Sequence, residues 1–181
     1  MEEGANKLYY VVGASGVGKD SLLNYARKQI DGKHRIIFAH RYITRAVDGS
    51  ENYISLTPEE FTERKEASFF ALNWDSHGNF YGIGKEIDYW MDSGFKVVVN
   101  GSREYLPEAK KRYPDLVVII IEASPETIRQ RLLVRGREDA IEIDKRMNRS
   151  KSITLQNESA IIITNDGTIN EAGDKLSETI I

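Results

Sequence analysis

The sequence predicts an α/β protein in which a parallel sheet is covered by helices on both faces. Apolar runs of strand length alternate along the chain with segments that repeat apolar residues at helical spacing. Most of these apolar runs are continuous, as at residues 8–12 and 116–121, which is typical of strands buried on both faces. A glycine-rich turn after the first run adds a third observation, because it marks the first strand–helix junction.

That turn contains the complete pattern Gly-x4-Gly-Lys from Gly13 to Lys19, and the helix after it ends at Asp31 and Gly32. Such a turn points backbone N–H groups at a phosphate, and the helix N-terminus and a lysine add positive charge. The sequence therefore predicts an ATP site in a P-loop NTPase fold. The predicted nucleotide-binding residues are Gly13, Ala14, Ser15, Gly16, Val17, Gly18, Lys19, Asp20 and Ser21, with Asn165 after the last strand.

A small insert, rich in aromatic residues, interrupts the strand–helix rhythm. Short strands are predicted at 53–56 and 69–74, with a hairpin turn at 75–79. Between the strands, Thr57 begins a helix as its N-cap, and Glu60 completes a capping box. We therefore divide the chain into a core, at residues 1–39 and 84–181, and an insert, at residues 40–83.

The rhythm resumes after the insert. Further strands are predicted at residues 95–99, 116–121 and 160–164. A helix with Ser124 as its N-cap ends at Gly136, and the highly charged residues 137–158 predict another helix. Parallel strands end at one edge of their sheet, so we expect the phosphate loop, Asn100 and Asn165 to lie together there.

Composition limits the classes of partner. The 181 residues are 40% hydrophobic and 29% charged, with a net charge of −3 and no cysteine. Disulfides and thiolate metal sites are therefore excluded, and no general attraction to nucleic acid is implied. No apolar run approaches the roughly 20 residues that span a membrane. We expect a cytoplasmic protein that binds small molecules, with no membrane or nucleic-acid partner; the oligomeric state is left open.

Arginines are concentrated in two parts of the chain. The later set is Arg129, Arg131, Arg135, Arg137, Arg146 and Arg149. The earlier set is Arg41, Arg45 and Arg103, each just beyond a predicted strand. Phosphoryl transfer mainly requires alignment and cationic clamps, and arginine binds phosphate oxygens two at a time. The later set predicts a lid over the nucleotide at residues 124–150, and a solvated helix face paired with nearby acids is the alternative. The earlier set predicts an acceptor site.

Several stretches in order along the chain match one enzyme family. They are Gly13-x-Ser15-Gly16-x-Gly18-Lys19-Asp20-Ser21-Leu22-Leu23, Arg41-Tyr42-Ile43-Thr44-Arg45, Gly49-Ser50-Glu51-Asn52, Leu72-x-Trp74, Tyr81-Gly82-Ile83-Gly84-x-Glu86-Ile87-Asp88, Val99-Asn100-Gly101-Ser102-Arg103 and Arg131-Leu132-x-x-Arg135-Gly136-Arg137. The sequence resembles the guanylate-kinase-type branch of the nucleoside monophosphate kinases. More closely, it resembles the ribose 1,5-bisphosphate phosphokinases of phosphonate catabolism. The resemblance implies a guanylate-kinase-like core with an acceptor-binding insert and a lid.

Two departures from guanylate kinases concern recognition of the base. Those enzymes read the guanine edge with carboxylates at the places that hold Asn73 and Asn100 here. Loss of a charge-assisted hydrogen bond weakens binding by about 1.5–3 kcal/mol, which erodes selectivity for guanine. Arg45 and Tyr53, in contrast, match the residues that hold the phosphate of the acceptor. The insert therefore favours a sugar bisphosphate over a nucleotide.

The resemblance implies that ATP phosphorylates ribose 1,5-bisphosphate to 5-phospho-α-D-ribose 1-diphosphate, with Mg²⁺ as the cofactor metal. Lys19 is the expected contact to the β- and γ-phosphates. The expected lid cations are Arg135, Arg137 and Arg146. The expected acceptor contacts are Arg41, Arg45, Tyr53, Tyr81 and Arg103.

The loop motif does not directly identify the metal ligand, because Asp20 stands where the pattern usually has Ser or Thr. We predict that Asp20 binds Mg²⁺, directly or through water. In the alternative, Asp20 only caps the helix, and Ser21 or water serves the metal. A nucleoside monophosphate kinase is the alternative enzyme, and a non-catalytic binding module is the alternative of another class. The intact Gly13, Gly18 and Lys19 argue against that module.

Overall fold

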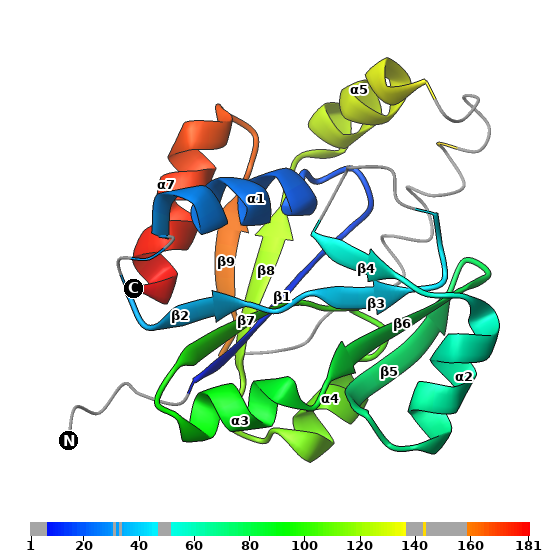
Figure 1. The fold of residues 1–181 in the computed structure, drawn as a ribbon. Helices are drawn as coiled ribbons and strands as arrows, with labels where there is room; N and C mark the ends of the chain where they lie inside the picture. The colour runs from blue at the N-terminus through cyan, green and yellow to red at the C-terminus, as the bar shows by residue number, and fades with distance from the viewer. Residues whose placement is uncertain (1–6, 31, 33, 47–51, 137–142, 144–158) are drawn as a thin grey trace.

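A computed structural model describes residues 7–30, 32, 34–46, 52–136, 143 and 159–181 (Figure 1). Its core sheet contains β1 (Leu8–Gly13), β2 (Ile36–Phe38), β7 (Lys96–Asn100), β8 (Val117–Glu122) and β9 (Ile161–Thr164). The strand order is β2-β7-β1-β8-β9, and each neighbouring pair is parallel. The predicted parallel sheet is confirmed.

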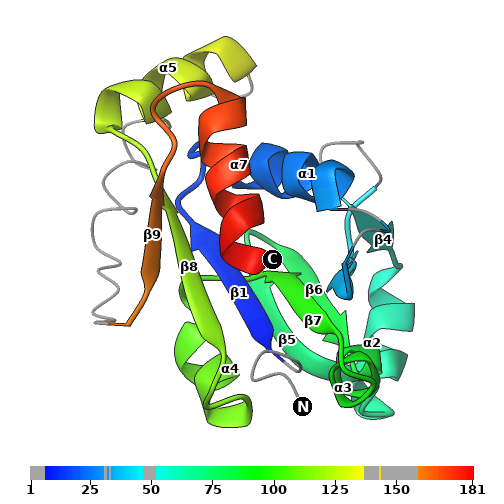
Figure 2. The same cartoon turned by 90° about the vertical axis from the view of Figure 1, so that its left-hand side faces the viewer.

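Helices cover both faces of this sheet (Figures 1 and 2). They are α1 (Lys19–Ile30) and α7 (Ile169–Ile180) on one face, and α3 (Glu86–Asp92) and α4 (Leu106–Arg112) on the other. Successive side chains of β1 explain this arrangement, because Tyr9 and Val11 pack toward α1 and α7 while Tyr10 and Val12 pack toward α3 and α4. A strand buried on both faces accounts for its continuous apolar sequence.

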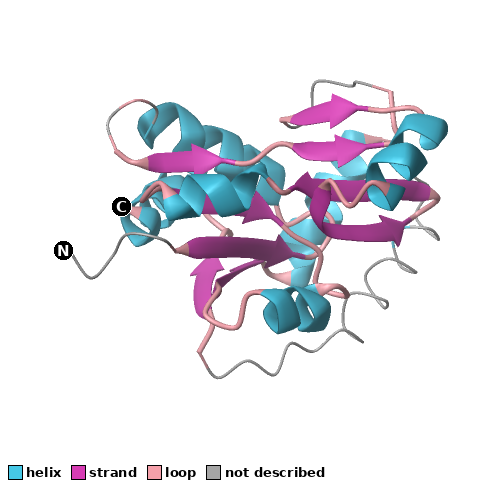
Figure 3. Cartoon of the chain, turned by 60° about the horizontal axis from the view of Figure 1, so that its bottom comes forward, coloured by secondary structure: helices cyan, strands magenta, loops and turns pink. Residues whose placement is uncertain are grey.

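The insert forms a sheet of its own beside the core (Figure 3). It contains β3 (Arg41–Ile43), β4 (Tyr53–Ser55), β5 (Phe70–Ser76) and β6 (Asn79–Gly84), in the order β4-β3-β6-β5. The turn between β5 and β6 is tighter than predicted, because only His77 and Gly78 form it, with φ of 50° and 76°. Residues at both ends of the predicted turn pair as strand instead, with Ser76 opposite Asn79.

The helix of the insert, α2 (Pro58–Glu66), corrects one detail of the sequence prediction. Thr57 accepts a hydrogen bond from the Glu60 backbone N–H at 3.1 Å, as an N-cap should. The Glu60 carboxylate, however, accepts from Arg64 at 2.6 Å, and within the described residues it does not return to Thr57. Only half of the predicted capping box forms, because an arginine one turn later competes for the carboxylate.

The helix α5 (Pro125–Arg135) begins and ends as predicted. Ser124 caps its first turn, and Gly136 ends it in the left-handed region at φ 62°. The charged helix predicted at 137–158 lies outside the described residues, apart from Ile143. No helix among the residues described is both long and apolar enough to cross a membrane.

Candidate active site

The phosphate loop connects β1 to α1 at the carboxyl edge of the core sheet. Gly16 and Gly18 both have a φ of 86°, a region that other residues adopt with strain. This alternation of backbone conformation is how successive N–H groups come to face one concavity. The loop therefore has the backbone shape that its sequence predicted for holding phosphate.

Side chains from two later elements form hydrogen bonds to the backbone of the loop. Asn165, which follows β9 and is 4% exposed, donates its side-chain amide to the Val17 carbonyl at 2.7 Å. Arg131 of α5 donates to the same carbonyl at 3.1 Å. A Cβ on Gly18 would lie 2.6 Å from the Asn165 amide nitrogen, so only glycine fits there. Asn165 thus has a structural role in holding the loop, whatever it contributes to nucleotide binding.

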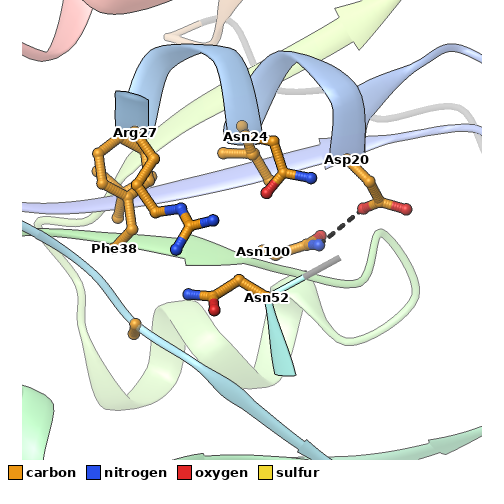
Figure 4. Close-up of a pocket in the computed structure, with 9 residues that line it drawn as sticks. Asp20, Asn24, Arg27, Phe38, Asn52 and Asn100 are labelled. Atoms are coloured by element: carbon orange, nitrogen blue, oxygen red, sulfur yellow. Dashed lines mark hydrogen bonds between the residues drawn. The ribbon is translucent and has the colours of Figure 1, made fainter. Parts of the chain in front are cut away.

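Lys19, Asp20 and Asn100 form a connected polar group at the start of α1. The Lys19 ammonium donates to the side-chain oxygen of Asn100, and the Asn100 amide nitrogen donates to the Asp20 carboxylate at 2.8 Å (Figure 4). The Lys19 nitrogen also lies 3.4 Å from the same Asp20 oxygen. Asn100 ends β7, so the sheet itself positions the lysine and the carboxylate relative to each other.

The surroundings of Asp20 keep its carboxylate ionised. Burial raises its pKa, but the charges of Lys19 and Arg41 and the hydrogen bonds from Asn100 and Lys19 outweigh burial. The net result is a pKa lowered to about 2. At any pH near neutrality, Asp20 therefore presents a negative charge beside the phosphate loop.

The insert contributes two arginines that lie over aromatic rings. Arg41 is 9% exposed, and its guanidinium carbon lies 5.3 Å from the centre of the Tyr81 ring. Arg45 lies over Tyr53 in the same way at 4.9 Å. Residue Tyr53 pairs with Arg41 across β3 and β4, so both arginine–tyrosine pairs belong to one part of the insert. Each predicted arginine of the insert thus lies over a predicted tyrosine.

An aromatic stack fixes the position of Tyr81. The Trp74 ring lies parallel to the Tyr81 ring, with 5.6 Å between centres and 3° between planes. Trp74 also stacks with Tyr105 of the core, with 5.5 Å between the ring centres. The stack joins the insert to the core beside the cleft. Trp74 is not among the predicted site residues, although its place opposite Tyr81 in the hairpin is a sequence signal for this contact.

Arg103 projects from the turn that follows β7. The turn is held by Tyr10, whose hydroxyl donates to the Ser102 carbonyl at 3.1 Å and accepts from the Ser102 N–H at 3.0 Å. Burial lowers the pKa of the Arg103 guanidinium, and the charge of Glu104 opposes that shift. Arg103 is therefore a partly desolvated cation at the same edge of the sheet as Lys19.

These parts line one open cleft of about 800 Å³. Predicted residues in its wall are Gly13, Ala14, Ser15, Gly16, Gly18, Lys19, Asp20, Ser21, Arg41, Tyr81, Arg103 and Asn165. Arg131, Trp74, Ser102 and Glu104 line it too, and none of these was among the predicted site residues. The second arginine–tyrosine pair of the insert, Arg45 and Tyr53, is not part of the described wall. Of the predicted lid cations, Arg137 and Arg146 lie outside the described residues, and Arg135 is placed only as the end of α5.

A family model described as guanylate kinase matches residues 5–181. The chain belongs to the guanylate kinase family. A solved structure of guanylate kinase from Anaplasma phagocytophilum agrees in fold, with a TM-score of 0.75 at 20% identity, covering 99% of this chain and 87% of that one. The predicted guanylate-kinase-like fold is confirmed.

Curated relatives in this family are more similar in sequence. A protein from Thiobacillus denitrificans is 48% identical over 181 residues, covering 99% of this chain and 94% of the relative. One from Burkholderia mallei is 51% identical over 170 residues, covering 93% and 92%. One from Desulfomicrobium baculatum is 45% identical over 177 residues, covering 97% and 95%. All three are named ribose 1,5-bisphosphate phosphokinase PhnN.

Proposed function

We propose that this chain is a phosphotransferase that makes 5-phospho-α-D-ribose 1-diphosphate and ADP from ATP and ribose 1,5-bisphosphate. The observation that carries the proposal is a single cleft in which an intact phosphate loop faces Arg41 and Tyr81 of the insert. Amides, Asn73 and Asn100, stand where the resemblance places the carboxylates that read guanine. The names of the curated relatives support the same reaction, and with it a place in phosphonate catabolism.

The acceptor atom makes the chemistry simple. A phosphate monoester has a second pKa of about 6, so the 1-phosphate is already largely a dianionic nucleophile at neutral pH. Its oxygen attacks the γ-phosphorus of ATP, the bond to the β-phosphate oxygen breaks, and ADP leaves with those electrons. No general base is needed. The protein instead has to hold two anions in line and neutralise them.

Each side of the cleft has residues for one of the anions. The loop backbone and Lys19 suit the β- and γ-phosphates of ATP, because they combine N–H donors with a mobile cation. Arg41, fixed over Tyr81, suits the 1-phosphate, and Arg45, just after the same strand, adds a second cation over Tyr53. The lid cations proposed over the transferred group are Arg135, Arg137 and Arg146.

Magnesium fits the donor set at the start of α1. Mg²⁺ is commonly bound by one or two carboxylates together with substrate phosphates and water. Among the described residues, no group of three or more acidic or histidine side chains could hold a metal without such help. Asp20 is ionised, and one of its oxygens points away from Asn100 in Figure 4. We propose that Asp20 holds Mg²⁺, which when bound would neutralise charge on the ATP phosphates.

A product assay tests the proposed reaction. Purified protein is incubated with MgATP and ribose 1,5-bisphosphate, and phosphorus NMR follows the products. The expected result is a pyrophosphoryl signal on the sugar that grows in step with ADP. A parallel assay supplies GMP as acceptor, and turnover of GMP approaching that of the bisphosphate would overturn the proposal in favour of a nucleoside monophosphate kinase. Failure of ATP to bind in calorimetry would favour a non-catalytic module.

A further inference from the structure

A small hollow lies between α1 and the strands β2 and β7, beside the start of β4 (Figure 4). Its floor is apolar, and its rim is polar. The polar residues are Asp20, Asn24 and Arg27 of α1, Asn100 at the end of β7, and Asn52 just before β4. Asp20 also lines the main cleft, so the hollow adjoins the place where the acceptor is proposed to bind.

Arg27 is the cation of this hollow, and it lacks a complete set of partners. Its Nε is shielded from solvent and, within the described residues, has no hydrogen-bond partner. A guanidinium is always charged and carries N–H donors in a rigid planar fork, so a buried donor without an acceptor is unfavourable. In Figure 4 the guanidinium points away from α1, across the hollow toward Asn52. An anionic ligand would supply acceptor atoms that the described residues do not.

The spacing of these residues along α1 sets the length of such a ligand. Asp20, Asn24 and Arg27 are four and three residues apart, which places them on one helix face. The helix rises by about 10 Å over these seven residues, and side chains lean toward the helix N-terminus. The Arg27 head therefore lies closer to Asp20 than its backbone does. One small molecule with an anionic group at each end can therefore place one group in the main cleft, near Asp20, and the other beside Arg27.

We propose that this hollow binds the 5-phosphate of the sugar bisphosphate, which is the phosphate that does not receive the γ-phosphoryl group of ATP. The inference rests on the proposed function. In the main cleft, the insert offers Arg41 and Tyr81 to the reacting phosphate, and the second phosphate of the acceptor needs a cation of its own. Arg27 supplies that cation, and Asn24 and Asn52 supply amide donors from the two sides of the hollow.

The shape and floor of the hollow agree with a phosphate head group. The volume of the hollow that water-sized groups can occupy is about 30 Å³. This volume suits a few oxygen atoms and is too small for a nucleobase. Leu23, Phe38 and Val98 contribute the apolar part of the lining, and the Arg27 Nε is shielded from solvent. Charge-assisted hydrogen bonds are stronger in such surroundings. The hollow would thus select a bisphosphate over a sugar that has only the 1-phosphate.

The test compares two acceptors that differ only in the distal phosphate, ribose 1,5-bisphosphate and ribose 1-phosphate. The readout is the ratio of their kcat/KM values, because it isolates recognition of that phosphate. Arg27→Met keeps an unbranched stem of similar shape but removes the charged head, and the expected ratio falls about 10–100-fold. Arg27→Lys keeps the charge but not the fork, so its ratio should lie between those of Arg27→Met and the wild type. Lys28→Met, an exposed neighbour on α1, should keep the wild-type ratio.

A second variant and a competing residue keep the test decisive. Asn52→Ala approaches the hollow from the insert, so a lower ratio is expected there even if Arg27→Met folds poorly by thermal unfolding. An unchanged ratio in both Arg27→Met and Asn52→Ala would overturn the inference. So would a fall confined to Arg103→Met, which would place the distal phosphate in the main cleft. If the wild type forms no pyrophosphoryl sugar, the proposed function itself fails, which is a different result from an unchanged ratio.

Discussion

At the scale of single residues, Asn100 is central to the site. It accepts from Lys19 and donates to Asp20, so one neutral amide connects the lysine of the phosphate loop with the carboxylate beside it. A carboxylate at position 100 would stand next to Asp20, and two such like charges disfavour ionisation of both. The amide therefore suits a site in which the negative charge is carried by residue 20.

The proposed metal role of Asp20 predicts a specific loss in Asp20→Asn. The substitution keeps the shape of the side chain but removes the charge that Mg²⁺ requires. We expect the free Mg²⁺ needed for half-maximal rate to rise about tenfold or more, with the protein still folded. Initial rates at saturating ATP, measured across a Mg²⁺ titration, check this. An unchanged Mg²⁺ dependence in Asp20→Asn, with a shift in Ser21→Ala instead, would assign the metal to the hydroxyl.

A second residue-level prediction concerns Asn100→Ala. Removing the amide deletes hydrogen bonds to two charged partners, each worth about 1.5–3 kcal/mol. We expect kcat/KM for ATP to fall at least about 10-fold, because Lys19 is no longer held between the loop and β7. Asn170→Ala, an exposed asparagine on α7, is the matched control. Wild-type kinetics in Asn100→Ala would show that the loop positions Lys19 without help from the sheet.

At the scale of elements, helices α3 and α4 are connected by side chains beneath the sheet that carries the site. The Tyr113 hydroxyl, just after α4, donates to one Asp88 oxygen at 2.5 Å, and Arg112 donates to the other at 2.8 Å. Burial and the hydrogen bond to Asp88 raise the pKa of Tyr113 to about 12, against an ordinary value of 10.0. The two helices are thereby held under β7 and β1, whose ends form the site.

This link predicts a pH dependence of stability. Because the folded pKa lies above the unfolded one, the protonated hydroxyl stabilises the fold fully below pH 10, and its contribution is lost as the pH rises through about 12. We expect Tyr113→Phe to lower the free energy of unfolding by about 1 kcal/mol at pH 8 and by less at pH 11. Urea unfolding at both values checks it, with the exposed Tyr89→Phe as control. A difference that grows toward pH 11 would contradict this account.

At the scale of the whole molecule, residues from two separate sheets and their loops line one cleft. The parallel core brings the phosphate loop, Asn100 and Asn165 to one edge, and the insert brings Arg41 and Tyr81 opposite them. Substrates that bind between these two parts stabilise the folded state of both, since a ligand adds RT ln(1 + [L]/Kd) to stability.

The temperature of thermal unfolding should therefore show which acceptor binds. At about 100 times its Kd, a ligand adds roughly 2.7 kcal/mol, a shift of a few degrees for a chain of this size. We expect MgATP and ribose 1,5-bisphosphate each to raise the unfolding temperature, and GMP at the same concentration to have little effect. The measurement is a scan with each compound alone. Equal protection by GMP and the bisphosphate would contradict the loss of base recognition inferred from Asn73 and Asn100.

The sequence by itself determined the strand–helix alternation, the phosphate loop and the family. Continuous apolar runs and a glycine pattern are local signals, and they encode a buried parallel sheet and a phosphate-binding turn without reference to the rest of the chain. The sequence also distinguished the insert, whose aromatic residues and short strands interrupt the strand–helix alternation. The hairpin turn was predicted at residues 75–79 but is tighter, because His77 and Gly78 both adopt positive φ and let Ser76 pair with Asn79.

Only the tertiary structure decided which side chains meet. Asn165 was predicted to bind the nucleotide, and it lines the cleft. Its amide also donates to the Val17 carbonyl, a contact between residues 148 positions apart that no local pattern reveals. The stack of Trp74 on Tyr105, and the hollow around Arg27, likewise depend on how the insert sits against α1 and the core. Contacts between distant segments depend on how whole layers pack against each other. The pattern of apolar residues within one segment therefore predicts that it joins a layer, but not which distant side chains it contacts.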